Sequence, residues 1–166
     1  MNGERASPVC YGADADDEYM GYAGRDELLT ALNELLEAER AGARVALASL
    51  RDAANPAHEQ LMRAVHADET RWCVMLSREI CRLRGMPSRR CGDFFAKAMA
   101  ISDPADRFAF LNRGQLWVVR KLADLMRRVR EEGLHAELRA MLECHQENIV
   151  AAEELMARRA APIERN

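Results

Sequence analysis

The segment Met62–Leu83 constrains the fold most, because it carries a long apolar seam with helical spacing. Its apolar members recur at the intervals of a buried helix face and are Met62, Val65, Trp72, Leu76, Ile80 and Leu83. Glu69 lies on the same seam, three residues before Trp72. Burying a carboxylate without a partner costs several kcal/mol. The fold must therefore provide Glu69 with a cation, a proton or hydrogen bonds.

The composition favours helix along the whole chain. The 166 residues are 49% hydrophobic but only 5% aromatic, and no stretch alternates between apolar and polar residues as a half-buried strand does. A chain of this length can bury a core without disulfides or metals. The sequence therefore predicts one all-α domain.

Charge and hydropathy exclude several classes of protein. The net charge is −3 and the basic residues are scattered, so we expect no nucleic-acid binding. No apolar run approaches the ~20 residues of a membrane span, and the first residues lack the order of a signal peptide. The cysteines have no zinc-like spacing and are Cys10, Cys73, Cys81, Cys91 and Cys144. Free thiols in a reducing cytoplasm are the expectation.

Capping residues and prolines divide the chain into four long helices. Residues 1–24 are predicted to form a flexible tail, residues 25–160 a four-helix bundle, and residues 161–166 a frayed end. The first helix is expected from Asp26 to about Asp52, and the second from Asn55-Pro56 to Arg84. The third begins at Asp103-Pro104 and ends near residue 130. The fourth then runs to about residue 160.

The connection between the second and third helices is too long for a tight turn. A short helix is expected over residues 93–100, which adds ~14 Å, and about ten extended residues add ~33 Å. Together they match the ~42 Å length of a 28-residue helix. The connection therefore predicts a crossover that makes the second and third helices parallel.

Each long helix has one apolar seam, and polar residues interrupt each seam near its midpoint. The interruptions are Glu39, Glu69, Gln115, and His145 with Asn148. Helix midpoints in such a bundle share a level, so the sequence predicts a single polar layer inside an apolar core. Glu37 falls on another face of the first helix and is expected to be solvated.

This layout resembles the ferritin-like superfamily, which includes the rubrerythrins and bacterioferritins. The resemblance rests on LNELLEAERAGA (Leu32–Ala43), Glu69-x-x-Trp72, Gln115 and His145-x-x-Asn148. The amino-acid sequences of Asp93–Met99 and Leu111–Gln115 are also similar to those of this superfamily. It implies a four-helix bundle with a long crossover and a mid-bundle metal site, where the superfamily has Glu, Glu-x-x-His, Glu and Glu-x-x-His. Here Trp72 replaces one histidine and Gln115 replaces a glutamate. In the last motif, His145 stands at the position of the glutamate and Asn148 at the position of the histidine.

The layer admits more than one interpretation. Protonated His145 between Glu39 and Glu69, with the amides completing the hydrogen bonds, would form a metal-free network. Alternatively, these three residues would hold a single Fe, Mn or Zn ion, with Gln115 or Asn148 supplying an oxygen or an outer hydrogen bond. A small-molecule pocket beside Trp72 is a third possibility, and His66 could replace Glu69 as the residue that faces the layer.

The functional hypothesis is a binding or structural module with a degenerate metal-site layer. The alternative is a rubrerythrin-like metal-dependent oxidoreductase that acts on peroxide or oxygen. A homodimer is expected, with a subunit interface formed by Phe110, Gly114, Trp117, Leu36, Ala43 and Leu47. No small-molecule ligand can be named from the sequence.

Overall fold

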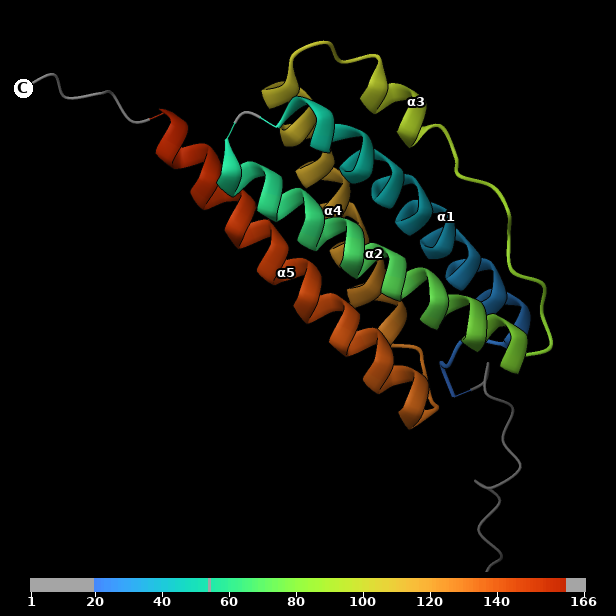
Figure 1. The fold of residues 1–166 in the computed structure, drawn as a ribbon. Coiled ribbons are helices and arrows are strands. Elements are labelled where there is room, and N and C mark those ends of the chain that lie inside the picture. Colours follow the sequence, from blue (N-terminus) through green and yellow to red (C-terminus); the bar gives the residue numbers. More distant parts are fainter. Residues whose placement is uncertain (1–19, 54, 161–166) are drawn as a thin grey trace, which may run out of the picture.

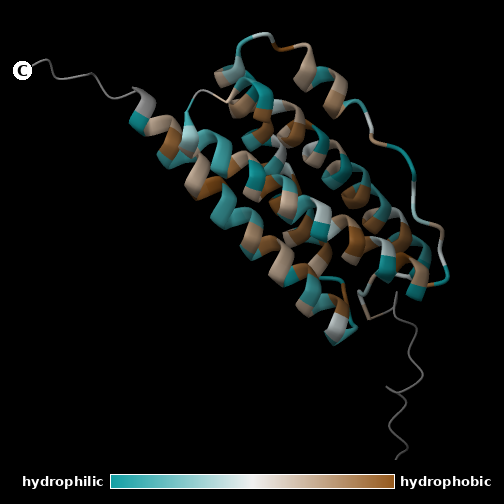
Figure 2. Cartoon of the chain, viewed as in Figure 1, coloured by the Kyte–Doolittle hydropathy of each residue, from teal (hydrophilic) through white to brown (hydrophobic). Residues whose placement is uncertain are grey.

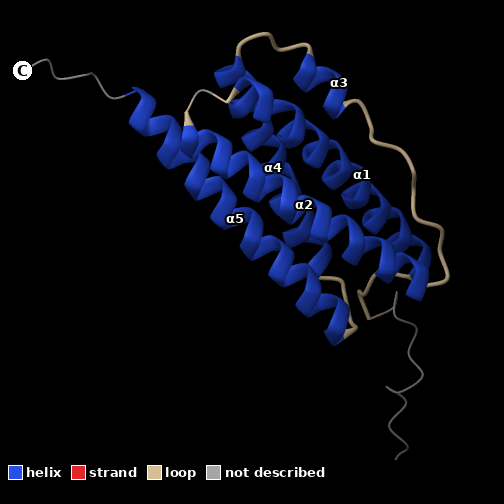
Figure 3. Ribbon diagram, viewed as in Figure 1, coloured by secondary structure: helices blue, strands red, loops and turns tan. Residues whose placement is uncertain are grey.

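The computed structural model describes residues 20–53 and 55–160, and within these ranges it contains helices and no strand (Figure 3). The long helices are α1 (Arg25–Ser49), α2 (Pro56–Arg82), α4 (Pro104–Met126) and α5 (Glu132–Ala160). A 3₁₀ turn, Leu50–Asp52, follows α1, and the short helix α3 (Phe94–Met99) lies in the crossover. The all-α prediction is confirmed. Most of the predicted tail (1–19) and the end (161–166) lie outside the described residues.

The predicted caps form two of the helix starts. The Asn55 side chain accepts a hydrogen bond from the backbone N–H of His58 at 2.9 Å, and Asp103 accepts from Ala105 and Asp106. Such caps satisfy backbone donors that have no partner within the helix. Several boundaries differ from the prediction by a few residues. Helix α1 starts one residue before Asp26 and ends at Ser49, before the 3₁₀ turn. Helix α2 ends at Arg82, and α4 already ends at Met126.

The four long helices form a bundle in which α1 and α5 run in one direction and α2 and α4 in the other (Figure 1). Neighbouring helices are α1 with α2, α2 with α5, α5 with α4, and α4 with α1. The pairs α1/α5 and α2/α4 therefore lie on the two diagonals. The predicted crossover is present and α2 and α4 are parallel, as expected. None of the described helices is both long and apolar enough to cross a membrane.

The crossover runs beside α1 and is bound to it by side chains (Figure 1). Asn33 Oδ1 accepts a hydrogen bond from the backbone N–H of Ser88 at 2.7 Å. The hydroxyl of Ser88 donates to Glu37 at 2.5 Å, and Arg40 donates to the carbonyl of Arg90 at 2.6 Å. The expectation that Glu37 is merely solvated was wrong, because this carboxylate binds the crossover. These bonds fix the position of the chain just before α3.

The core is divided into two apolar clusters, and polar residues gather on the outer faces of the helices (Figure 2). Along α1, the first cluster ends at Leu36 and the second begins at Val45. Along α4, the change occurs between Leu111 and Val118. In both helices the predicted polar residue lies at the change of cluster, and the same is true of α2 and α5. The polar layer therefore separates two cores.

Candidate functional site

Each long helix contributes one buried polar side chain to the layer between the two cores. Glu39 comes from α1, Glu69 from α2, Gln115 from α4 and His145 from α5. Their exposed fractions lie between 1% and 4%. The sequence pattern thus predicted these four positions correctly as inward-facing.

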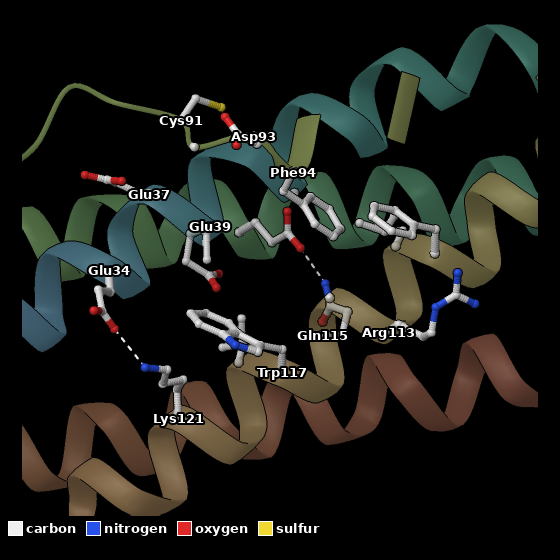
Figure 4. A pocket seen from close by; sticks show the side chains of 18 residues that line it. Glu34, Glu37, Glu39, Cys91, Asp93, Phe94, Arg113, Gln115, Trp117 and Lys121 are labelled. Atoms are coloured by element: carbon white, nitrogen blue, oxygen red, sulfur yellow. Dashed lines mark hydrogen bonds and ion pairs between the residues drawn. The ribbon is translucent and has the colours of Figure 1, made fainter. Parts of the chain in front are cut away.

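Two hydrogen bonds cross the diagonals of the bundle inside this layer. His145 Nε2 lies 3.2 Å from Glu39 Oε1 and joins α5 to α1. The amide nitrogen of Gln115 donates to Glu69 Oε1 and joins α4 to α2 (Figure 4). Diagonal helices have few other contacts, so these polar pairs link elements that apolar packing alone joins weakly.

The second ring nitrogen determines how His145 is protonated. His145 Nδ1 lies 3.0 Å from the backbone carbonyl of Met141, which can only accept, so Nδ1 carries hydrogen. Burial lowers the pKa of His145, but the charge of Glu39, its hydrogen bond and that of Met141 outweigh burial and raise the pKa above its usual value. Protonated His145 then donates from Nε2 and forms a buried ion pair with Glu39.

Glu69 has no cationic partner in the layer. Burial raises the pKa of Glu69 well above its usual value, and the negative charges of Glu39 and Asp68 raise it further, whereas the hydrogen bond from Gln115 opposes the change. The two carboxyl groups therefore occupy different electrostatic environments. Glu39 faces a cation, and Glu69 faces only a neutral donor.

Three oxygen atoms in the layer have no hydrogen-bond partner within the part of the chain that the structure describes. They are Glu39 Oε2, Glu69 Oε2 and Gln115 Oε1. Gly42 makes room for one of these groups, because a Cβ at this position would lie 2.3 Å from Glu69 Oε2. Buried polar atoms are nearly always hydrogen-bonded, so such a group of acceptors is typical of a site that a ligand, a water or an ion completes.

The same side chains line the inner end of a cavity of about 600 Å³ between α1, α4 and the crossover (Figure 4). Its walls are mainly apolar and include Phe94, Phe110, Leu111, Trp117 and Val118. Its rim carries Glu34, which pairs with Lys121 at 2.9 Å, together with Arg113 and Asp93. The cavity has the size of a typical small-molecule pocket.

Two aromatic rings form the wall next to the crossover. Phe94 of α3 stacks on Phe110 of α4 with ring centroids 4.7 Å apart. Gly114 is needed there, because a Cβ would lie 2.6 Å from the tip of the Phe94 ring. The arrangement of α3 on α4 therefore depends on a glycine that the sequence analysis assigned to a subunit interface.

The described residues match a known family along most of their length. The pattern of the family described as "Domain of unknown function (DUF6306)" matches residues 26–154. The chain belongs to this family. The match includes all four residues of the polar layer and the whole lining of the cavity. No curated protein and no solved structure matches the chain.

The remaining predicted site residue, Asn148, lies away from the cavity. Its amide donates to Asp68 Oδ2 at 3.2 Å, toward α2. Among residues 20–53 and 55–160, no group of three or more His, Cys, Asp and Glu side chains is placed to hold a metal ion. Both nitrogens of His145 are already engaged. A metal site formed by Glu39, Glu69, His145, Gln115 and Asn148 stays a prediction, and in this arrangement the donor set does not fit a dinuclear centre.

Other residues that the sequence singled out have structural contacts. His66 Nδ1 lies 2.9 Å from the backbone carbonyl of Ala43, so this histidine joins α2 to α1 at the edge of the layer. Burial is the main cause that raises the pKa of Cys73 to about 12 and that of Cys144 to about 11. Both thiols therefore remain protonated at neutral pH and are poor nucleophiles.

The residues predicted to form a subunit interface do not share one free face. Leu36 and Ala43 are buried inside the chain, and Phe110 and Gly114 pack against Phe94. The two that remain exposed are Leu47 and Trp117. The homodimer stays a prediction.

Sequence reasoning missed the cavity, because one of its walls comes from the crossover, which has no periodic signal. Cys91, Gly92 and Asp93 of the crossover line the cavity only because α1 binds the crossover through Asn33, Glu37 and Arg40. The available signal was a run of polar residues on α1 opposite a polar, proline-containing crossover.

Proposed function

We propose that this chain is a ferritin-like four-helix bundle that works as a small-molecule-binding module. The helix order, the crossover with its short helix and the polar layer with one residue from each long helix support the ferritin-like assignment. The binding site of the proposal is the cavity between α1, α4 and the crossover. The polar layer forms its inner end.

The observation that carries the proposal is the group of unpartnered oxygens on the inner wall of a cavity. Glu39, Glu69 and Gln115 are almost completely buried, yet each keeps one oxygen without a hydrogen bond in the described chain. Leaving one such acceptor unsatisfied costs about 1–3 kcal/mol, so a partner outside the described chain must complete them. A bound molecule with donor groups satisfies them and recovers this free energy.

A ligand screen with one filled pocket tests the proposal. Ala38 lines the cavity on α1, so Ala38→Phe would fill it. Ala31 lies two turns earlier on the same helix and is also partly buried, but does not line the cavity, so Ala31→Phe is the matched control. We expect compounds that raise the melting temperature of the wild type and of Ala31→Phe but not of Ala38→Phe. A diverse screen in which no compound acts, or in which all three proteins respond equally, would disprove the binding module.

A metal-dependent oxidoreductase is the second candidate, and the same free oxygens of Glu39 and Glu69 favour it. Two carboxylates and the imidazole of His145 are ligands that suit a single Fe, Mn or Zn ion. Metal binding would require His145 to exchange its contact with Glu39 for the ion. Elemental analysis of freshly purified protein tests this candidate. It requires near one equivalent of metal in the wild type and its loss in Glu69→Gln.

The homodimer and the cytoplasmic location belong to the same proposal. The exposed side chains of Leu47, Val74 and Trp117 are apolar groups that a second subunit could cover. The free thiols of Cys73, Cys81, Cys91 and Cys144 agree with a reducing compartment. Sedimentation of the purified protein at several concentrations would establish the oligomeric state.

A further inference from the structure

We propose that the cavity binds a primary amine, with the ammonium group held by Glu39, Glu69 and Gln115 and an apolar body between the aromatic walls. This inference rests on the proposed binding function and names the chemical class of the ligand. Three features of the site support it: the number of free acceptors, the balance of charge and the nature of the walls.

The free acceptors match the donors of an ammonium group. Glu39 Oε2, Glu69 Oε2 and Gln115 Oε1 all accept hydrogen bonds and lack a donor within the described chain. An alkylammonium ion presents three N–H donors on one atom and no acceptor. A carboxylate, a phosphate or a carbonyl group at this end would bring further acceptors and leave all the oxygens unsatisfied.

The charges of the buried layer also call for one cation. Glu39 is paired with protonated His145, and Glu69 has only the neutral amide of Gln115. When Glu69 is ionised, the layer therefore carries one negative charge in excess. A single ammonium group bound beside Glu69 would neutralise this charge. Charges that are buried and not paired are costly, so this match is worth more here than it would be at the surface.

The walls favour an organic ligand over a bare ion. Phe94 and Phe110 present stacked rings, and Trp117, Leu111 and Val118 complete an apolar surface between the layer and the opening. A metal ion needs only the polar end of such a cavity. An amine with a flat apolar body uses both, because its body removes apolar wall surface from water.

Three probes of similar shape test the ligand class: 2-phenylethylamine, 2-phenylethanol and phenylacetate. Binding to the full chain is measured by calorimetry and by the rise in melting temperature. We expect the amine to bind at least about tenfold more tightly than the alcohol, and phenylacetate not to bind. NMR should detect contacts between the phenyl ring of the amine and the side chain of Trp117.

Two variants and a control test the named residues. Glu69→Gln removes the unpaired charge, and Gln115→Met removes an acceptor. Glu59→Gln removes the same charge as Glu69→Gln from a half-exposed position of α2 that does not line the cavity, where Glu59 pairs with Arg63. We expect Glu69→Gln and Gln115→Met to weaken binding of 2-phenylethylamine at least about tenfold, and Glu59→Gln to leave it unchanged. Circular dichroism confirms that each variant is folded.

The outcomes separate the two proposals. If compounds from the screen bind in the cavity but 2-phenylethylamine binds no more tightly than 2-phenylethanol, the proposal of an amine ligand is refuted and the proposal of a binding module stands. Unchanged amine binding in folded Glu69→Gln also refutes the amine. If no compound of any class responds to filling the cavity with Ala38→Phe, both proposals fail together.

Discussion

Replacing Glu69 by glutamine should stabilise the fold at neutral and basic pH. Glutamine has nearly the same shape, and its amide oxygen can still accept the hydrogen bond from Gln115. The substitution removes a carboxyl group that is only 3% exposed and has one oxygen without a partner. Removing such a buried charge is worth on the order of 2 kcal/mol in the free energy of unfolding.

The pH dependence of the free energy of unfolding shows whether the charge of Glu69 causes the gain in stability. Burial and the charges of Glu39 and Asp68 raise the pKa of Glu69 above its usual value of 4.5, so the folded chain holds this proton more tightly than the unfolded chain. A raised pKa means that stability is fully present below pH 4.5 and is lost as the pH rises toward the folded-state pKa. Relative to wild type, Glu69→Gln should therefore gain stability with rising pH, by up to about 1.4 kcal/mol per pH unit in this window.

Urea unfolding followed by circular dichroism at several pH values measures this difference. The titration of His145 is common to both proteins and largely cancels in the comparison. Glu59→Gln, at a half-exposed glutamate paired with Arg63 on the same helix, is the matched control and should change stability by less than about 0.5 kcal/mol. A stability difference between Glu69→Gln and wild type that does not change with pH would refute the reasoning.

Three further perturbations test the layer and its surroundings. His145→Leu leaves Glu39 buried without its cation and should destabilise the fold by about 3–5 kcal/mol in denaturant unfolding. This loss should be largest below pH 6.5 and shrink as the pH rises through the raised pKa of His145. Gly42→Ala should lower the free energy of unfolding by about 1–3 kcal/mol in the same assay, because the new Cβ overlaps the carboxyl group of Glu69. Unchanged stability would show that this carboxyl group has room to move. In peptide mapping after brief alkylation at neutral pH, exposed Cys81 should be modified well before Cys144, whose pKa is raised to about 11; equal rates would contradict the burial argument.

The sequence predicted the helices and the layer because both depend on local periodicity. Glu39, Glu69, Gln115 and His145 each replace one apolar member of a regular seam, and a helix turns such a residue inward regardless of distant contacts. Even the parallel arrangement of α2 and α4 followed from chain length alone.

What the sequence could not show depends on contacts between segments far apart in the chain. Periodicity places His145 in the layer but does not reveal that it pairs with Glu39, or that Asn148 turns toward Asp68. The choice of partner depends on which helices lie on a diagonal and on the rotation of each helix about its axis. The cavity depends further on a non-periodic crossover, whose position hydrogen bonds such as that between Asn33 and Ser88 determine.

The two uses of Glu69→Gln together decide what the layer is for. A buried carboxyl group with a free oxygen lowers stability, so a layer that serves only the fold would be improved by the substitution without any loss. If the variant is more stable and no longer binds 2-phenylethylamine, the layer sacrifices stability for recognition, as binding sites commonly do. If it is more stable and binds as before, Glu69 does not hold the ammonium group, and the amine proposal is refuted. If it is less stable, the wild type must satisfy Glu69 Oε2 with a group beyond the described chain, such as a bound cation.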